Sequence, residues 1–307
     1  MTGLILHNYP QSPVAEKVRV GLGIKKLAWS SVEIPRLPPK PDVVPLTGGY
    51  RRTPVLQAGA DVYCDSQCIL RELDRRFPEP TFFPGGGHGV PWGVSRWTDG
   101  ELFTRAVAVV IGTSAAQMPP EWVNDRGRLY FGSGFDVDRL SADVAHNAAQ
   151  VHAQLGWIND RLSGRDYVLG SGPGLPDALC YHIVWFLRAR WKEGPAMIDS
   201  FPALAAWEKR VEAIGHGSPT PMTPAEALDI AARAEPRTPE GFDPKDPQGL
   251  KPGMTVAVTP MGDGGDPAVK GTVRHAGRDT IALLRRDGRV GDVCVHFPRV
   301  GYRVTVL

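Results

Sequence analysis

TPVLQAGADVYCDSQCIL, residues 53–70, joins two short extended runs to the start of a helix. The runs at 53–59 and 60–66 meet at a glycine-containing turn, which is typical of a β-hairpin. The segment SQCILRELDRRF, residues 66–77, predicts a helix, and Pro78 and Pro80 follow it as a stop signal. The stretch therefore predicts a β-β-α unit.

The residues before this unit predict a strand, a helix and a second strand. Short apolar runs at 4–8 and 28–34 favour strands. Between them, apolar residues recur every four positions over 12–27, as on one face of a helix. The proline-rich segment 35–45 leaves room for only a short, irregular helix. Residues 1–84 are predicted to form an α/β domain of order β-α-β-(α)-β-β-α.

Beyond residue 84 the pattern changes twice. After a glycine-rich linker, residues 90–216 predict an all-helical domain, with helices at 93–115 and 136–163 and a buried helix that begins near Gly174. Residues 217–249 contain seven prolines and predict a linker with one short helix. Residues 250–307 hold five short strand patterns, which predict a small, barrel-like β domain.

Composition excludes several classes of partner. The 307 residues include 35 basic and 33 acidic side chains, a net charge of +2, so we expect neither a nucleic-acid nor a membrane partner. The longest apolar run is far below the roughly 20 residues of a membrane span, and we expect a cytoplasmic protein. The four cysteines lack the spacing of zinc ligands, so no metal is expected.

Three short motifs stand out. Pro54 opens the first run of the hairpin, and Asp65 and Ser66 follow it at the start of the helix. Each has an ordinary structural explanation, because proline is tolerated at the first residue of a strand and serine is a common helix N-cap. A helix start also offers unpaired N–H groups, which favour a bound carboxylate. The third motif, GLPD at 174–177, opens the buried helix, where Asp177 can reach back to a backbone N–H although Gly174 has no side-chain acceptor.

Residues 3–216, with these motifs in this order, resemble the glutathione transferase superfamily, in which a thioredoxin-like domain precedes an all-helical domain. The strands after residue 249 lie outside this resemblance. The resemblance implies a cis peptide bond at Thr53–Pro54 in the glutathione site. It also implies that the backbone of Val55 pairs with the cysteinyl part of glutathione. Ser66 would then hold the γ-glutamyl carboxylate, and Asp65 the γ-glutamyl amino group.

The same resemblance implies a place for the other groups of glutathione. The glycyl carboxylate would lie near Arg52, since a guanidinium can hold a carboxylate through two hydrogen bonds. The thiol would lie where the first helix begins, and there Ser12 stands where redox-active members have a cysteine. A hydroxyl cannot form a mixed disulfide, but it can donate a hydrogen bond to a thiolate and so lower the pKa of the bound thiol. Ser12 is the first candidate for this role and Tyr9 the second, and the third alternative is that neither acts.

The resemblance thus predicts a glutathione transferase that uses glutathione as co-substrate and no metal. The thiolate would attack a hydrophobic, small-molecule electrophile or a peroxide, in a pocket formed by the helix at 93–115 and the buried helix. A homodimer is expected. The alternative function is a non-catalytic interaction or scaffold protein that keeps the fold and binds a partner through the C-terminal β domain.

Overall fold

The N-terminal α/β unit has the predicted order. The computed structural model describes residues 3–307. Strand β1 (Ile5–Asn8) pairs in parallel with β2 (Ala28–Glu33) and antiparallel with β3 (Val55–Ala58), which pairs antiparallel with β4 (Asp61–Cys64). Helices α1 (Pro13–Ile24), α2 (Val44–Thr47) and α3 (Ser66–Arg76) lie between and after these strands, and α2 is a single turn in the proline-rich segment.

Local sequence explains where these helices begin. Ser12 has an extended backbone, and its Oγ accepts a hydrogen bond from the backbone N of Ala15 at 3.1 Å, so it caps α1. For α3 the prediction that Ser66 is the N-cap was wrong. Asp65 takes that place, because its carboxylate accepts a hydrogen bond from the backbone N of Gln67 at 2.8 Å. Ser66 is the first residue of the helix itself.

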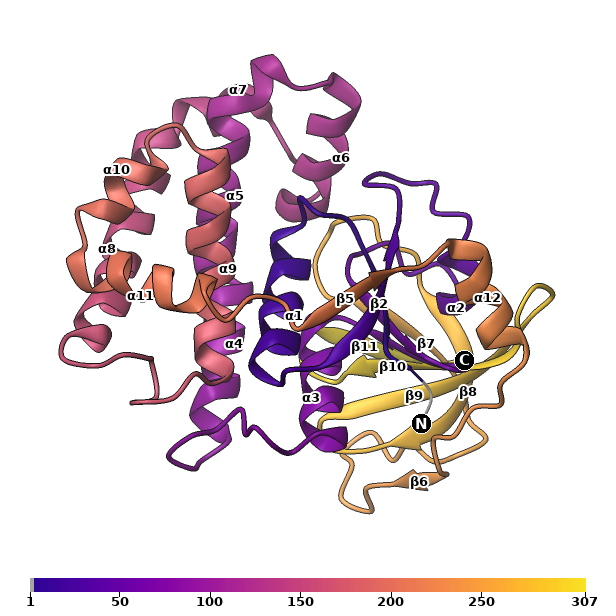
Figure 1. The fold of residues 1–307 in the computed structure, drawn as a ribbon. Coiled ribbons are helices and arrows are strands. Elements are labelled where there is room, and N and C mark those ends of the chain that lie inside the picture. The colour runs from indigo at the N-terminus through magenta and orange to yellow at the C-terminus, as the bar shows by residue number, and fades with distance from the viewer. Residues whose placement is uncertain (1–2) are drawn as a thin grey trace.

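The helical region stands beside the sheet, and α1 packs against its helix α9 (Leu175–Arg190) (Figure 1). It comprises, in chain order, α4 (Gly89–Asp99), α5 (Glu101–Ser114), the 3-10 turn η1 (Ala115–Gln117), α6 (Pro120–Phe131), α7 (Val137–Ala142), α8 (Val144–Leu162), α9 (Leu175–Arg190), α10 (Gly194–Asp199) and α11 (Pro202–Glu212). The buried helix α9 packs against α1 and begins as predicted, with the Asp177 carboxylate accepting a hydrogen bond from the backbone N of Gly174 at 2.8 Å.

Two of the predicted long helices are divided in the structure. The helix is interrupted at Gly100, between α4 and α5, and at Asp143, between α7 and α8. A Cβ at Gly100 would lie 2.7 Å from the carbonyl oxygen of Arg96, so a residue without a side chain is required there. The apolar periodicity continues across both breaks, which is why it did not reveal them.

The proline-rich segment 217–249 contributes more than the predicted linker and helix. Strand β5 (Ser218–Pro221) pairs in parallel with β2, and helix α12 (Pro224–Ala232) follows it. The short strand β6 (Gly241–Phe242) pairs with β8 (Val269–Ala276). The side-chain amide of Gln57 donates a hydrogen bond to the carbonyl oxygen of Ala227 at 2.8 Å, which fastens α12 to the sheet.

The C-terminal strands are present as predicted, but among residues 3–307 no strand pairing closes them into a barrel. Strands β7 (Thr255–Pro260), β8, β9 (Thr280–Asp287) and β10 (Gly291–Pro298) form an antiparallel series, and β11 (Tyr302–Val306) pairs with β7. Instead of closing on themselves, they join the N-terminal sheet, because β10 pairs in parallel with β4. Within residues 3–307 one sheet runs in the order β11-β7-β8-β9-β10-β4-β3-β1-β2-β5. This pairing satisfies the backbone groups that an edge strand at β4 would leave open.

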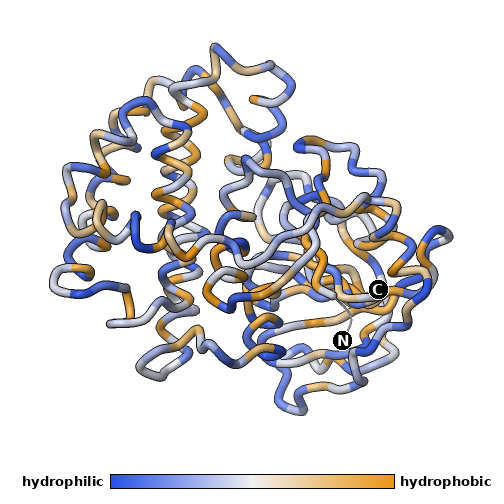
Figure 2. Tube along the Cα trace, viewed as in Figure 1, coloured by the Kyte–Doolittle hydropathy of each residue, from blue (hydrophilic) through white to orange (hydrophobic). Residues whose placement is uncertain are grey.

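The common sheet separates two hydrophobic cores. Successive side chains of β1 point to opposite faces, so Leu6 packs against the helical region and Ile5 packs against the C-terminal strands. Figure 2 shows apolar residues along the helices and within the strands of both regions. Among residues 3–307 no helix is both long and apolar enough to cross a membrane.

Candidate functional site

A polar cavity of about 420 Å³ lies where the α/β unit, the helical region and the C-terminal extension, residues 250–307, meet. We call it the polar cavity. Its walls include five of the residues singled out in the sequence, namely Tyr9, Ser12, Arg52, Asp65 and Ser66, together with Thr53. Pro54 and Val55 are not among its lining residues. The structure therefore brings together residues from α1, the β3 turn and the start of α3, which are up to 57 positions apart in the chain (66 − 9).

The turn before β3 presents Thr53 to the polar cavity. The Thr53–Pro54 peptide bond is cis, as predicted. Val55 is fully buried as the first residue of β3, between β1 and β4, so its expected contact with a ligand stays a prediction. The hydroxyl of Thr53 accepts a hydrogen bond from Lys40 Nζ at 2.7 Å. Burial, with Arg126 and another arginine nearby, lowers the pKa of Lys40 to about 7.

The start of α3 is held in a special backbone conformation. Asp65 has φ of 76°, a left-handed region that a non-glycine residue adopts at a cost of order 1–3 kcal/mol. Beneath it, the buried Lys17 forms an ion pair with Asp99 of α4 and donates a hydrogen bond to Ser66 Oγ at 2.9 Å. The carboxylates of Asp65 and Asp99 both reach the polar cavity, and Lys17 lowers the pKa of Asp99 against the effect of burial.

The C-terminal extension completes the cavity on the side of Asp65. The hydroxyl of Tyr302, on β11, donates a hydrogen bond to Asp65 Oδ2 at 3.0 Å and lies 3.1 Å from the hydroxyl of Tyr50. Burial, and then the neighbouring charge of Asp99, raises the pKa of Asp65, while the hydrogen bonds from Gln67 and Tyr302 oppose that shift. Burial removes water from the Asp65 carboxyl and so disfavours its charged form. A cation bound beside it would favour the charged form again, because opposite charges attract.

Arg52 is already paired with a residue of the extension. Its Nε lies 3.1 Å from both carboxylate oxygens of Asp266, and its Nη2 lies 2.5 Å from Oδ2. The loop that carries Asp266 also contacts the helical region, since Asp263 accepts a hydrogen bond from the backbone N of Ser133 at 3.1 Å. Two aspartates thus fasten the β7–β8 loop across the polar cavity. Arg52 lines the cavity, but part of its hydrogen-bonding capacity is used by the protein, and its contact with a ligand stays a prediction.

Both candidates for the thiol-activating hydroxyl lie at the polar cavity. Ser12 is 2% exposed, and its Oγ accepts the capping bond from Ala15, which leaves its own proton available to a ligand. Tyr9 lines the polar cavity and also a neighbouring apolar one. The geometry therefore keeps both residues as candidates.

The neighbouring cavity, which we call the apolar cavity, also has a volume of about 420 Å³. It is lined by α5 and α9, the two helices from which the sequence predicted an acceptor pocket, and equally by α6. Tyr9, Phe103, Arg126 and Tyr130 line both cavities, so the two are adjacent. The apolar cavity can hold a hydrophobic molecule next to a group bound in the polar cavity.

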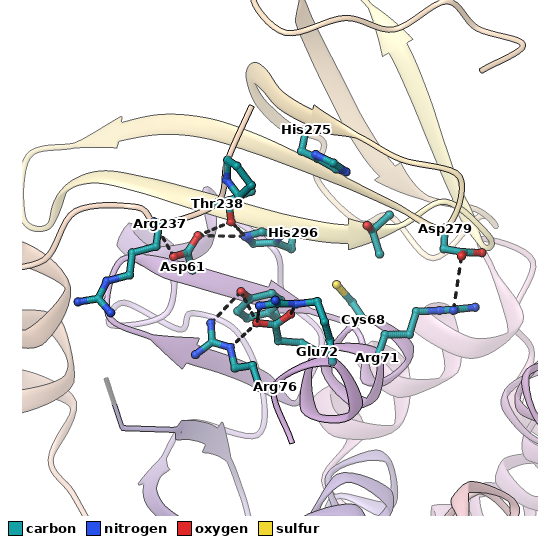
Figure 3. A pocket seen from close by; sticks show the side chains of 14 residues that line it. Asp61, Cys68, Arg71, Glu72, Arg76, Arg237, Thr238, His275, Asp279 and His296 are labelled. Atoms are coloured by element: carbon teal, nitrogen blue, oxygen red, sulfur yellow. Dashed lines mark hydrogen bonds and ion pairs between the residues drawn. The ribbon is translucent and has the colours of Figure 1, made fainter. Parts of the chain in front are cut away.

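A third cavity, of about 440 Å³, follows the seam between α3, β4 and the extension (Figure 3). Asp61, Cys294 and His296 place potential metal-binding atoms within 4.8 Å of one another there. The Asp61 carboxylate, however, accepts hydrogen bonds from the Thr238 hydroxyl at 2.6 Å and the Arg237 backbone N at 2.8 Å, and lies 3.2 Å from His296 Nε2. This network fastens the 237–238 segment to the sheet without requiring an ion.

Sequence reasoning missed Lys17, Asp99, Tyr302 and Asp266. Lys17 carried a signal, since it lies in the second turn of an amphipathic helix, next to Val18, and so borders the face that packs against another element. Tyr302 and Asp266 carried none, because each meets its partner across more than 200 positions of sequence.

The chain is similar to known proteins over both its N-terminal and its helical region. The sequence matches the family models for the N-terminal domain of glutathione S-transferase over residues 6–81 and for its C-terminal domain over residues 141–210. A search of curated proteins found no match. A solved structure described as a GST-like protein from Pseudomonas syringae is 36% identical, with a TM-score of 0.81, and the match covers 100% of both chains. The extension is therefore shared with that protein.

Two further solved structures match the chain without most of the extension. A glutathione S-transferase from Methylobacterium radiotolerans, in complex with glutathione sulfonate, is 24% identical with a TM-score of 0.50, over 69% of this chain and 91% of that one. The beta-etherase LigF from Sphingobium sp. strain SYK-6 is 18% identical with a TM-score of 0.52, over 69% of this chain and 96% of that one. At these identities the likeness concerns the fold alone.

Proposed function

Because this chain belongs to the glutathione transferase superfamily, we propose that the polar cavity binds glutathione and that the protein transfers it to an electrophile in the apolar cavity. The observation that carries the proposal is the start of α3. There Asp65 and Asp99 direct carboxylates into a cavity that also receives the N-terminus of α3 and Ser66. Such a site matches the ammonium and the carboxylate at the γ-glutamyl end of glutathione.

The remaining parts of glutathione follow from this placement. With the ammonium between Asp65 and Asp99 and the carboxylate at Ser66, the peptide extends along the turn at Thr53, which precedes the cis bond and lines the cavity. Backbone groups of this turn, in residues 53–55, would pair with the cysteinyl part as an added strand does. Arg52 would meet the glycyl carboxylate with the donor groups that Asp266 leaves free.

The chemistry needs an ionised thiol and a nearby electrophile. Ser12 or Tyr9 donates a hydrogen bond to the sulfur, which stabilises the thiolate relative to the thiol and releases the proton to solvent. The thiolate then forms a carbon–sulfur bond with the electrophile, and the leaving group departs with its electron pair. With a hydroperoxide as acceptor, two glutathione molecules are oxidised to the disulfide while the peroxide is reduced to an alcohol and water.

Calorimetry with glutathione and with cysteinylglycine, which lacks the γ-glutamyl residue, tests the proposal. We expect glutathione to bind and Asp65→Asn to weaken it about tenfold or more, since a hydrogen bond to a charged group contributes roughly 1.5–3 kcal/mol. Asp160→Asn, an exposed aspartate on α8, is the matched control. Equal binding of the two peptides, or no heat with glutathione at millimolar concentration, would refute a γ-glutamyl site.

The alternative is a non-catalytic interaction or scaffold protein that binds a partner through the C-terminal β domain. The absence of any heat with glutathione at millimolar concentration would favour it. We also retain the homodimer and the cytoplasmic location as proposals. Light scattering tests the first, and the outer edge of β4 is not available for it because β10 occupies that edge. Fractionation of cells tests the second.

A further inference from the structure

The apolar cavity combines a hydrophobic interior with a positively charged rim. Its interior is built from Phe103, Val107 and Ile111 of α5, Trp122 of α6 and Phe186 of α9. These side chains suit a molecule with an aromatic or aliphatic body.

Three arginines line the same cavity, and no described residue that lines it is an aspartate or a glutamate. Arg36 comes from the loop after β2, Arg126 from α6 and Arg190 from the end of α9. They therefore converge from three separate parts of the chain. Arg126 is buried, whereas Arg36 and Arg190 are exposed and line the cavity at its solvent-facing rim, where a negatively charged ligand would meet them.

The protein neutralises little of this charge. Arg126 is 7% exposed, and its nearest carboxylate, Asp125, lies 3.8 Å from it and is already bonded to Arg51 at 2.6 Å. Within residues 3–307, Arg36 and Arg190 take part in no ion pair. Arg36 instead lies over the ring of Trp122, with its Cζ 5.6 Å from the ring centroid. That stacking holds a guanidinium at the edge of the cavity with its donor groups free.

We propose that the second substrate is a hydrophobic electrophile that carries a carboxylate. This inference rests on the proposed function and assigns its substrate class. Arg36 and Arg190, which line the apolar cavity but not the polar one, pair with the carboxylate. The reactive carbon then lies at the other end, near Tyr9 and Tyr130, where the two cavities meet. Arg126 lines both cavities and faces either the carboxylate or the charge that develops on the leaving group.

A matched pair of electrophiles tests the proposal. One is a chlorodinitrobenzoate and the other its neutral methyl ester. In both, the thiolate forms a carbon–sulfur bond to the ring, the carbon–chlorine bond breaks and chloride leaves with the electron pair, while the thiol proton goes to solvent. With each kcat/KM divided by the uncatalysed rate constant, we expect the carboxylate to exceed the ester about tenfold. The variant Arg36→Gln/Arg190→Gln should remove that preference and change the ester less than about twofold, in line with two rim contacts of about threefold each.

The control variant is Arg128→Gln, which removes an exposed arginine from α6 outside the cavity. It should leave the preference unchanged and so exclude an effect of net charge. Arg190→Glu should favour the ester over the carboxylate. An unaltered preference in the double variant, or equal rates for the two electrophiles in the wild-type protein, would overturn the proposal.

Direct binding separates this proposal from the proposed function. If glutathione fails to bind or neither electrophile reacts, the proposed function fails, and calorimetry with the unreactive dinitrobenzoate and dinitrobenzamide still decides the inference. Tighter binding of the carboxylate, lost in Arg36→Gln/Arg190→Gln, supports it. Equal binding of the acid and the amide refutes it.

Discussion

Removal of one hydroxyl from the C-terminal extension should alter the pH dependence of glutathione binding. Tyr302 donates a hydrogen bond to the Asp65 carboxylate at 3.0 Å, and this bond lowers a pKa that burial and Asp99 raise. Tyr302→Phe therefore raises the pKa of Asp65 further. A hydrogen bond to a charged group contributes roughly 1.5–3 kcal/mol, which corresponds to about one to two pKa units.

The direction of the effect follows from the ionised form. The glutathione ammonium needs Asp65 as a carboxylate, so binding is lost as the pH falls through the pKa of Asp65. In Tyr302→Phe the acid limb of the binding profile should move to higher pH by about one to two units, with little change on the alkaline side. Calorimetry or ligand-induced fluorescence change, measured from acid to neutral pH, gives this midpoint.

The same substitution predicts a change in stability. A carboxyl whose native pKa lies above its unfolded value binds more protons when the protein is folded. The free energy of unfolding therefore falls as the pH rises from the unfolded pKa through the native one. Because Tyr302→Phe raises the native pKa of Asp65, the pH range over which the free energy of unfolding falls should extend to higher pH. Tyr50→Phe is the control, because it removes the hydroxyl beside Tyr302 but leaves the bond from Tyr302 to Asp65. A binding midpoint in Tyr302→Phe equal to that of the wild-type protein would refute the role of Asp65.

Four further perturbations follow from the structure. Ser12→Ala should bind glutathione nearly normally but need a higher pH for turnover, by about one to two units if Ser12 bonds the thiolate; an unchanged thiolate titration by absorbance would assign the role to another group. Phe297→Ala should lower the free energy of unfolding by about 3–5 kcal/mol in a denaturant titration, because this fully buried ring packs edge-on to an aromatic neighbour in the second core. A chain ended at Asp246 should aggregate or lose its cooperative thermal transition, since it leaves the outer edge of β4 without its partner strand and one face of the sheet uncovered; a monomeric, cooperatively melting fragment would contradict this. Gly23→Ala should destabilise the protein more than an alanine in an exposed helix, because the new Cβ would lie 2.0 Å from the carbonyl oxygen of Gly215, and comparison of melting temperatures with Gly156→Ala checks it.

Much of the α/β unit could be predicted because its signals are local. Asp65 lies eleven positions after Pro54, and Ser66 lies twelve positions after it. A helix start or a short turn is encoded by the few residues that form it. Ser12 and Asp177 were predictable for the same reason, since each bonds a backbone N–H three residues away.

The contribution of the extension could not be predicted because its contacts are distant in sequence. Strand patterns showed that residues 250–307 form strands, but not which strand β10 would pair with. The register that places Cys294 opposite Asp61 is decided by the open edge of β4 and by the packing of side chains on both faces. The partners of Asp65 and Arg52 in the site are consequences of that register.

The pairing of β10 with β4 also sets the order in which the newly made protein can finish folding. Strand β4 ends at Cys64. Its partner strand β10, which pairs through Cys294, leaves the ribosome 230 residues later (294 − 64). At about 5–20 residues per second, the edge of β4 waits on the order of 10–50 seconds without its partner. During synthesis that edge is open to pairing with other nascent chains until residues 250–307 have emerged.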